Sequence, residues 1–412
     1  MKTSLYPRLI LIAVVSSMLL VSCEKSEKLP SEPVPINLTL KGEMLVNSGN
    51  EFAFDIFKKI LDDTPAEKNV IFSPLSISYA LSMTVNGAAG PTRDSILKAL
   101  RLHDISVEDL NSNYNLLTKA LLSVDKRVAI SIANSVWVEN NFVVKEPFMK
   151  ALTDFYNAEA RNFDISNPLT PDAINEWIES KTNGLIKKMI DGLSDNTVML
   201  LINAIYFKGQ WKMQFEKSAT APRQFMRGDG SIVQAQAMNQ TAGIKYYSNY
   251  GFSVAEFPYG QGNYVMDVIL PNGLDLTDLK ASLSESAYNT WVSNMHEANL
   301  NVYMPRYKFG YKNELKPILA SMGMGIAFGN ADFSGITDDN IFISSVLHQA
   351  FIETNEEGTE AAAVTVVTFE TTSAGPHEPY TFDINKPFLF VIRETTTNSI
   401  LFMGKVNDPT AE

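Results

Sequence analysis

The feature that most constrains the fold is an almost unbroken apolar run, TVMLLINAIYFKGQW, at residues 197–211. The run is rich in Ile, Tyr, Phe and other strand-forming residues, and it stops at Lys208–Gly209. Such a run is typical of a strand buried on both faces in the middle of a sheet. Asn203 lies inside it, and a buried amide needs hydrogen-bond partners. We therefore expect a covered sheet with a polar contact near its centre.

Helix and strand patterns follow one another irregularly around this run. Apolar residues at helical spacing predict a helix over residues 50–62, and alternation predicts a strand over 127–139. Residues 387–406 have the pattern of a closing hairpin. No linker interrupts the chain between about residue 40 and its end, and the strand–helix–strand alternation of a doubly wound sheet is missing. The chain is therefore predicted to be one large α+β domain.

One expected helix has an unusual composition. Ser73 suits its N-terminal cap and Pro74 its first turn. The face at residues 76–82 then carries mainly Ser and Ala, so another element must approach this helix closely. A further helical pattern is interrupted at Asn183–Gly184.

The composition excludes some partners. The chain has 412 residues, of which 45% are hydrophobic and 19% charged, as in ordinary globular proteins. Its net charge of −12 argues against nucleic acid or an anionic membrane surface as a partner. A single cysteine, Cys23, allows neither an intramolecular disulfide nor a thiolate metal cluster.

The N-terminus has the layout of a secretory signal, with early basic residues and then an apolar run. Its LVSC sequence at residues 20–23 resembles a bacterial lipobox, in which the cysteine becomes the lipidated first residue. We therefore expect a lipoprotein signal peptide at 1–22, a charged and Pro-rich tether at 23–37, and a folded domain at 38–412. A plain signal peptide or a membrane anchor is the alternative, although the apolar run is short for a membrane span.

Catalytic motifs are missing from the sequence. The four histidines, His103, His296, His348 and His377, have no metal-binding spacing, and no G-x-S-x-G elbow is present. The GMGIAFG segment at 323–329 follows an expected helix, which is the wrong context for a dinucleotide loop. We therefore expect no enzyme activity, no metal and no cofactor.

A strand-like segment near the C-terminus, NEEGTEAAAVTVVTFETTSAGPHEPY at residues 355–380, has no obvious place in the fold. In an extended conformation, one face from Thr359 to Phe369 is uncharged and begins with small side chains. The opposite face carries Glu360 and Glu370 at its ends. The first face can turn toward a core, although any edge strand would alternate in the same way. Gly358 gives the backbone freedom where the segment begins.

Several segments together resemble the serpin family, in the order in which serpins carry them. They are NVIFSPLSI, INEWIESKTNGLI, LINAIYFKGQWKMQF, YMPRYKF, HQAFIETNEEGTEAAA and NKPFLFVIRETTTNSILFMGKVNDP. The resemblance implies three β-sheets, about nine helices and an exposed reactive centre loop at about 356–380. It also implies a suicide inhibitor of serine proteases: after cleavage, the loop inserts into the main sheet and traps the acyl-enzyme. Energetically, ordering the loop backbone nearly cancels the new hydrogen bonds, so the uncut protein should be metastable.

The resemblance also assigns residues to roles. The loop hinge would be Glu356, Glu357, Gly358, Thr359, Glu360, Ala361, Ala362 and Ala363. A shutter cluster under the sheet would be Ser73, Ser76, Asn203 and His348, and a breach at its top Arg306, Trp211 and Lys208. The scissile bond would be Thr372–Ser373, with Val367 or Phe369 as alternative sites.

These assignments lead to expectations about partners. A small residue at the cut, with no Arg or Lys between Gly358 and Asn385, suits elastase-like or subtilisin-like proteases in a 1:1 covalent complex. The protein would be a monomer, attached to a bacterial outer membrane or cell surface only through its N-terminal lipid. The alternative function is a non-inhibitory serpin acting as a carrier or chaperone.

Overall fold

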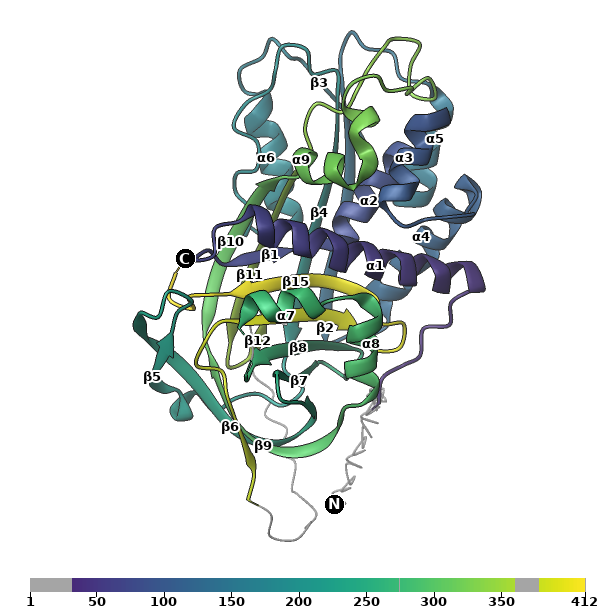
Figure 1. Cartoon of the computed structure of the whole chain (residues 1–412). Helices are drawn as coiled ribbons and strands as arrows, with labels where there is room; N and C mark the ends of the chain where they lie inside the picture. Colours follow the sequence, from purple (N-terminus) through teal and green to yellow (C-terminus); the bar gives the residue numbers. More distant parts are fainter. Residues whose placement is uncertain (1–31, 274, 360–377, 412) are drawn as a thin grey trace, which may run out of the picture.

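The computed structural model describes residues 32–273, 275–359 and 378–411. Within these ranges the chain forms nine α-helices and fifteen strands in two hydrogen-bonded sheets (Figure 1). The helices are α1 (Leu40–Asp63), α2 (Pro74–Val85), α3 (Gly90–Ala99), α4 (Val107–Ser123), α5 (Glu146–Tyr156), α6 (Thr170–Lys181), α7 (Leu276–Ser282), α8 (Glu285–Ser293) and α9 (Lys316–Leu319). The mixture of helices and strands confirms the predicted α+β class.

Six strands form the sheet that contains the apolar run, in the order β10-β11-β12-β4-β2-β3. They are β10 (Tyr307–Glu314), β11 (Leu347–Asn355), β12 (Gly358–Thr359), β4 (Met199–Gln210), β2 (Val128–Glu139) and β3 (Glu159–Phe163). The predicted central strand is β4, which lies between β12 and β2. Its middle is largely buried, but its first three residues are only half-buried, so burial on both faces holds for part of the strand.

The other nine strands form a second hydrogen-bonded sheet. They are β1 (Val70–Phe72), β5 (Ala221–Met226), β6 (Ile232–Ser248), β7 (Phe252–Tyr259), β8 (Tyr264–Pro271), β9 (His296–Pro305), β13 (Tyr380–Asp383), β14 (Phe388–Glu394) and β15 (Ile400–Val406). The long strand β6 pairs with β5 and β9 along most of its length, but with β7 only over Lys245–Ser248. This short ladder divides the nine-stranded sheet into two parts. Together with the six-stranded sheet, these two parts make the three expected sheets.

Local signals fixed the ends of several elements. The Ser73 side chain caps α2 by accepting from the Ser76 backbone N–H, as predicted. The small face of α2 is explained by its contacts with both β4 and β15. Helix α6 ends at Lys181, and the next residues, Asn183 and Gly184, have positive φ angles of 53° and 82°. Helix α1 begins at Leu40, ten residues before the predicted start. The first part was missed because Gly42 and Gly49 interrupt the apolar pattern of the sequence.

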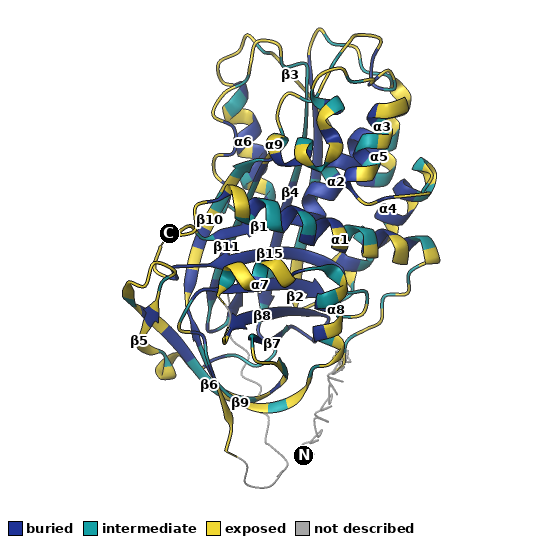
Figure 2. Ribbon diagram, in the orientation of Figure 1, coloured by how far each residue is buried: buried dark blue, intermediate teal, exposed yellow. Residues whose placement is uncertain are grey.

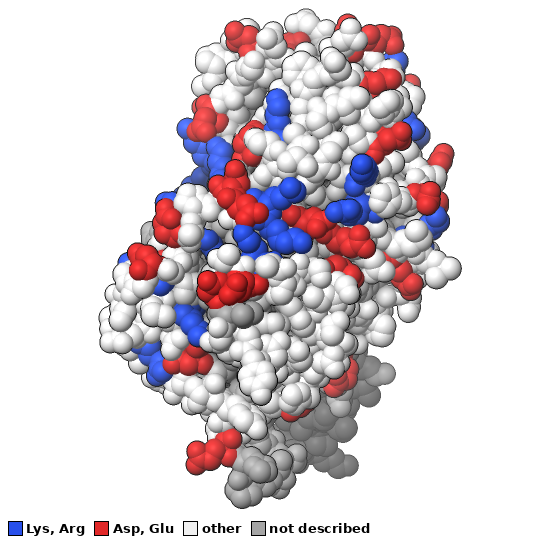
Figure 3. All heavy atoms as spheres, in the orientation of Figure 1, with Lys and Arg blue, Asp and Glu red and all other residues white. Residues whose placement is uncertain are grey.

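The core lies between the sheets and under α1 and α2, where Figure 2 shows strands that are buried along most of their length. Acidic and basic side chains are interleaved across the middle of the face in Figure 3, which includes α1. On that helix Asp55 pairs with Arg101, and Asp62 pairs with Lys280. Exposed pairs of this kind contribute little to stability.

The chain before α1 lies along the folded domain at residues 34–36. Val34 exchanges two hydrogen bonds with the Asn263 side chain, and the Ile36 N–H donates to Thr396 Oγ1. The last residues of the predicted tether are therefore attached to the domain. Among the described residues, no helix is long and apolar enough to span a bilayer.

Candidate functional site

The hinge begins with a tight reversal at the end of β11. Glu356 and Glu357 form a turn, and the chain returns as β12 between β11 and β4. Thr359 pairs with Thr354 on one side and with Gly209 on the other. The expectation that the loop lies wholly outside its sheet is therefore wrong for Gly358 and Thr359, since both are already strand residues.

Gly358 is required by its surroundings. Its φ of 149° lies in a region that L-residues rarely adopt, and a Cβ atom here would lie 2.1 Å from the carbonyl oxygen of Gly209. The two backbones can therefore approach only because this position has no side chain. Gly209 is also confined, since its own Cβ would lie 2.8 Å from the ring of Tyr259.

Thr359 faces inward, as the alternation predicted. It is 4% exposed, and its hydroxyl lies 2.7 Å from the hydroxyl of Tyr259. Tyr259 lies at the end of β7 in the other sheet, so this bond joins the hinge to the layer beneath. No pattern around Tyr259 in the sequence indicated that role.

An ion pair holds the hinge turn at the top of the sheet. The Glu356 side chain is buried and accepts from Arg306 Nε at 2.7 Å and from the Thr220 hydroxyl. Burial raises the pKa of Glu356, but the hydrogen bonds from Arg306 and Thr220 outweigh burial and leave the pKa below its usual value. Glu356 of the predicted hinge and Arg306 of the predicted breach are thus in contact, whereas Thr220 was not predicted.

Trp211 also holds the turn. Its indole N–H donates to the Asn355 carbonyl at 2.9 Å, and its backbone N–H donates to the Glu357 carbonyl at 2.8 Å. Its ring stacks on Tyr259 with centroids 4.3 Å apart. Lys208 lies on β4, three residues before Trp211 and in register with Ala129 of β2. In the turn itself, Glu357 forms an ion pair with Lys217.

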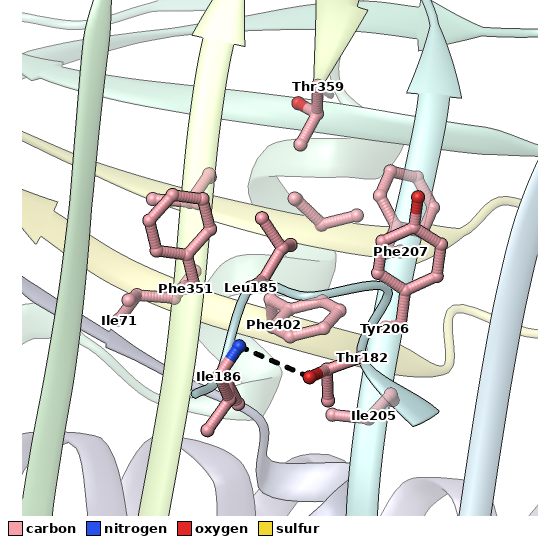
Figure 4. Close-up of a pocket in the computed structure, with 12 residues that line it drawn as sticks. Ile71, Thr182, Leu185, Ile186, Ile205, Tyr206, Phe207, Phe351, Thr359 and Phe402 are labelled. Carbon is pink, nitrogen blue, oxygen red and sulfur yellow. Dashed lines mark hydrogen bonds between the residues drawn. The ribbon is translucent and has the colours of Figure 1, made fainter. Parts of the chain in front are cut away.

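Below Thr359 the six-stranded sheet has a gap. Strands β11 and β4 are joined only through the two residues of β12 within the described part of the chain. Figure 4 shows Thr359 above this gap, with Phe351 on one side and Tyr206 and Phe207 on the other. The hollow itself measures only about 20 Å³, close to the room needed by one water.

The gap is narrow because the chain after α6 fills it. Thr182, Leu185 and Ile186 line the hollow together with the strand residues, and the Ile186 N–H donates to Thr182 Oγ1 at 3.2 Å (Figure 4). In that view Leu185 lies between Phe351 and Phe207. An added strand would have to move this segment, which was not predicted.

The four predicted shutter residues meet at the lower end of the gap. The Ser73 N–H donates to His348 Nε2 at 3.1 Å, and the Ser76 N–H donates to Ser73 Oγ at 3.1 Å. The Ser76 hydroxyl then donates to Asn203 Oδ1. This arrangement supplies hydrogen-bond partners for the Asn203 amide, which is half-buried and not fully buried as predicted.

The hydrogen-bonded chain extends beyond the predicted residues. Asn203 Nδ2 donates to Asn134 Oδ1 at 2.6 Å, and Asn134 Nδ2 donates to the Tyr156 carbonyl at 2.6 Å. Asn134 lies opposite Asn203 in the β2–β4 ladder. A polar residue in the alternating 127–139 run was the one available signal for it.

Burial governs the ionisation of His348. The side chain is 6% exposed, and burial lowers its pKa to about 4. The imidazole is therefore neutral at pH 7, which suits its role as the acceptor for the Ser73 N–H. A proton on Nε2 would remove that hydrogen bond.

Part of the predicted site lies outside the described residues. This applies to Cys23, to the later hinge residues and to the reactive bond with its alternatives: Glu360, Ala361, Ala362, Ala363, Thr372, Ser373, Val367 and Phe369. No cluster of His, Cys, Asp and Glu that could hold a metal occurs among the residues that the structure describes.

Comparison with known proteins agrees with this geometry. The family model described as serpin (serine protease inhibitor) matches residues 47–409. Iripin-2 of Ixodes ricinus is 34% identical over 372 residues, covering 88% of this chain and 93% of that protein. The leukocyte elastase inhibitor of Xenopus tropicalis is 34% identical over 383 residues, covering 89% and 100%. The structure of human thyroxine-binding globulin matches with a TM-score of 0.82 at 28% identity, covering 90% of this chain and 100% of that one.

The chain therefore belongs to the serpin family, and its fold is the serpin fold. The family model describes inhibitors of serine proteases, not proteases. The neighbours also include thyroxine-binding globulin, so membership of the family does not by itself identify the function.

Proposed function

We propose that the protein is a suicide inhibitor of serine endopeptidases that works by inserting its cleaved loop between β11 and β4. One observation carries this proposal: β12 already occupies the top of the gap, and the loop continues directly from it. The strand needed to fill the gap is therefore the continuation of a strand that has begun to form.

The register of β12 supports the same proposal. If the ladder continued unchanged, residue 365 would lie opposite both His348 on β11 and Asn203 on β4. Residue 365 is a threonine on the uncharged face of the loop. Its hydroxyl could donate to one of these side chains and accept from the other, so the inserted strand would suit the polar cluster it meets.

Insertion also requires a source of free energy. New ladder bonds contribute about 1 kcal/mol each, and ordering the backbone opposes them by a similar amount per residue. The segment after α6 that contains Leu185 must also leave the gap between β11 and β4. We infer that the uncut protein is metastable and that the incomplete ladder between β11 and β4 contributes to the driving force.

The loop sequence favours proteases that cut after small residues. With Thr372–Ser373 as the scissile bond, elastase-like and subtilisin-like enzymes are the proposed targets. The similarity to the leukocyte elastase inhibitor of Xenopus tropicalis supports this class. The inhibitor is proposed to act as a monomer in a 1:1 covalent complex.

The test mixes the purified protein with an elastase-like protease. We expect a complex that survives denaturing electrophoresis, and mass spectrometry of the released C-terminal peptide identifies the cut bond. The cleaved protein should also melt at a higher temperature than the intact one. Clean cleavage without a complex, together with unchanged melting, would refute inhibition by insertion.

A carrier function is the second candidate, because thyroxine-binding globulin is a close structural neighbour. The hinge argues against it, since Gly358 and the small residues after it suit insertion. The hollow under Thr359 is far smaller than typical ligand pockets of roughly 300–1,000 Å³, so a carried ligand would have to bind elsewhere. The melting comparison separates the two functions, because a carrier needs no stored strain.

We also propose that Cys23 is lipidated and attaches the protein to a bacterial outer membrane or cell surface. The supporting observation is the lipobox-like LVSC sequence at 20–23 after a short apolar run. Cys23→Ala should release the protein from the membrane fraction. Unchanged fractionation would reject the lipid anchor without bearing on inhibition.

A further inference from the structure

The segment at residues 33–36, which we name the strap, is held by two turns of the domain. Val34 N–H donates to Asn263 Oδ1 at 2.9 Å, and Asn263 Nδ2 donates back to the Val34 carbonyl at 2.8 Å. The Ile36 N–H donates to Thr396 Oγ1 at 3.0 Å. The amide of Asn263 thus pairs with both backbone groups of one residue, as a neighbouring strand would.

The turns that receive the strap are rigid. Asn263 is fully buried, and its amide also donates to Glu394 Oε1 at 3.1 Å. Glu394 is itself fully buried and accepts hydrogen bonds from Thr396 and Thr397. These hydrogen bonds lie within the domain and do not involve the strap, so they favour a preorganised site for it.

The receiving site adjoins the hinge. Asn263 directly precedes β8, and Tyr259 at the other end of the β7–β8 turn holds Thr359 through its hydroxyl. The same turn contacts β4, since the Gly260 N–H donates to the Gln210 carbonyl at 2.8 Å. Figure 1 shows the chain running from the start of α1 toward the end of the molecule that holds β6, β7 and β9.

The strap therefore changes both where the tether leaves the domain and how far it reaches. With the strap bound, the first attached residue is Val34, eleven positions after Cys23; without it, the first is the helix cap Thr39, sixteen positions after Cys23. Eleven residue steps span at most about 40 Å, against about 55 Å for sixteen. The exit point also moves from the start of α1 to the β7–β8 turn.

We propose that the strap orients the anchored protein, so that its loop-bearing end faces the bilayer across a space no wider than the tether. This inference rests on the lipid anchor proposed above.

Energy transfer in vesicles tests the orientation. The full-length lipidated protein is bound to vesicles whose headgroups carry an acceptor dye, and a donor is placed on one introduced cysteine. Tyr380→Cys puts the donor at the start of β13, next to β9, and Val143→Cys puts it in the β2–α5 connection at the far end of the molecule in Figure 1. Both native side chains are well exposed, at 70% and 79%. We expect stronger transfer from position 380 than from position 143.

The strap is then released by substitutions at its two N–H donor residues. The double variant Val34→Pro/Ile36→Pro removes the two N–H donors, and Glu32→Pro serves as the matched control. The difference between the donors should shrink in the double variant and persist in the control. Equal transfer from both positions in the native strap, or an unchanged difference in the double variant, would overturn the proposal.

Failure of the underlying proposals has separate signatures. A protein that does not float with vesicles lacks the lipid anchor, and the orientation falls with it. A protein that floats but forms no protease complex in detergent is anchored without being an inhibitor. Equal transfer in a protein that floats and inhibits rejects only the role of the strap.

Discussion

Replacing Thr359 by Arg tests the insertion route most directly. Thr359 is 4% exposed, bonds to Tyr259 and lies above the gap between β11 and β4. The described residues that line the hollow include no acidic side chain. A guanidinium here would therefore be buried without a counter-charge, or it would hold the hinge out of the sheet.

The size of the effect follows from burying a charge. Even after partial relaxation the penalty is several kcal/mol. If the arginine holds the hinge out of the sheet in the uncut protein, insertion must bury the charge, and about 3 kcal/mol of this penalty in the barrier slows insertion roughly 150-fold. Hydrolysis of the acyl-enzyme, which the substitution does not touch, would then finish first. The variant should change from inhibitor to substrate.

The assay titrates a fixed amount of elastase-like protease with each variant and follows residual activity and the complex on denaturing gels. Thr359→Arg should be cleaved at the same bond, form little complex and leave the protease active. Thr359→Ser keeps the hydroxyl and the small volume, so it serves as the control that still inhibits. A Thr359→Arg protein that forms the complex at the native ratio would refute the inward assignment and the insertion route.

Two more perturbations follow from the site. Burial lowers the pKa of His348 to about 4 in the folded protein, whereas in the unfolded chain the pKa is about 6.5. Between these pH values the unfolded chain binds one more proton than the folded protein, so the free energy of unfolding falls as pH drops from about 6.5 to 4. The free energy of unfolding decreases by about 3 kcal/mol over this range. His348→Gln should remove this pH dependence in urea unfolding. The same dependence of stability on pH in the variant would contradict the role of His348. Leu185→Ala should speed insertion after cleavage, because the half-buried leucine side chain must leave the gap and its burial contributes about 1 kcal/mol. Removing this contribution from the barrier should raise the insertion rate about fivefold. Stopped-flow fluorescence measures this rate, with the exposed Leu169→Ala as control; equal rates for the two variants would show that Leu185 does not obstruct the gap.

Some features of the protein could be predicted because their causes are local. The apolar run around Asn203 predicted the central strand, since uniform apolarity is what a covered strand needs. Ser73 and Pro74 predicted the start of α2, because a cap acts within three residues. The hinge was assigned through the resemblance to serpins, and Gly358 added the local reason that the backbone needs freedom there. For these features a short stretch of sequence carries most of the physical reason for the structure.

The partners of these residues were decided only by the tertiary structure. Asn134 joins Asn203 across 69 positions, Tyr259 joins Thr359 across 100, and Asn263 joins Val34 across 229. Leu185 fills the gap because α6 ends where it does, and not because of any pattern around it. A single Asn, Tyr or Leu has the same local preference wherever it stands, so the choice of its partner depends on how distant strands are brought together. The sequence by itself thus determined a covered sheet and a strand-like segment near the C-terminus, whereas the folded chain decided which residues hold the hinge turn, what fills the gap below Thr359 and where residues 34–36 attach.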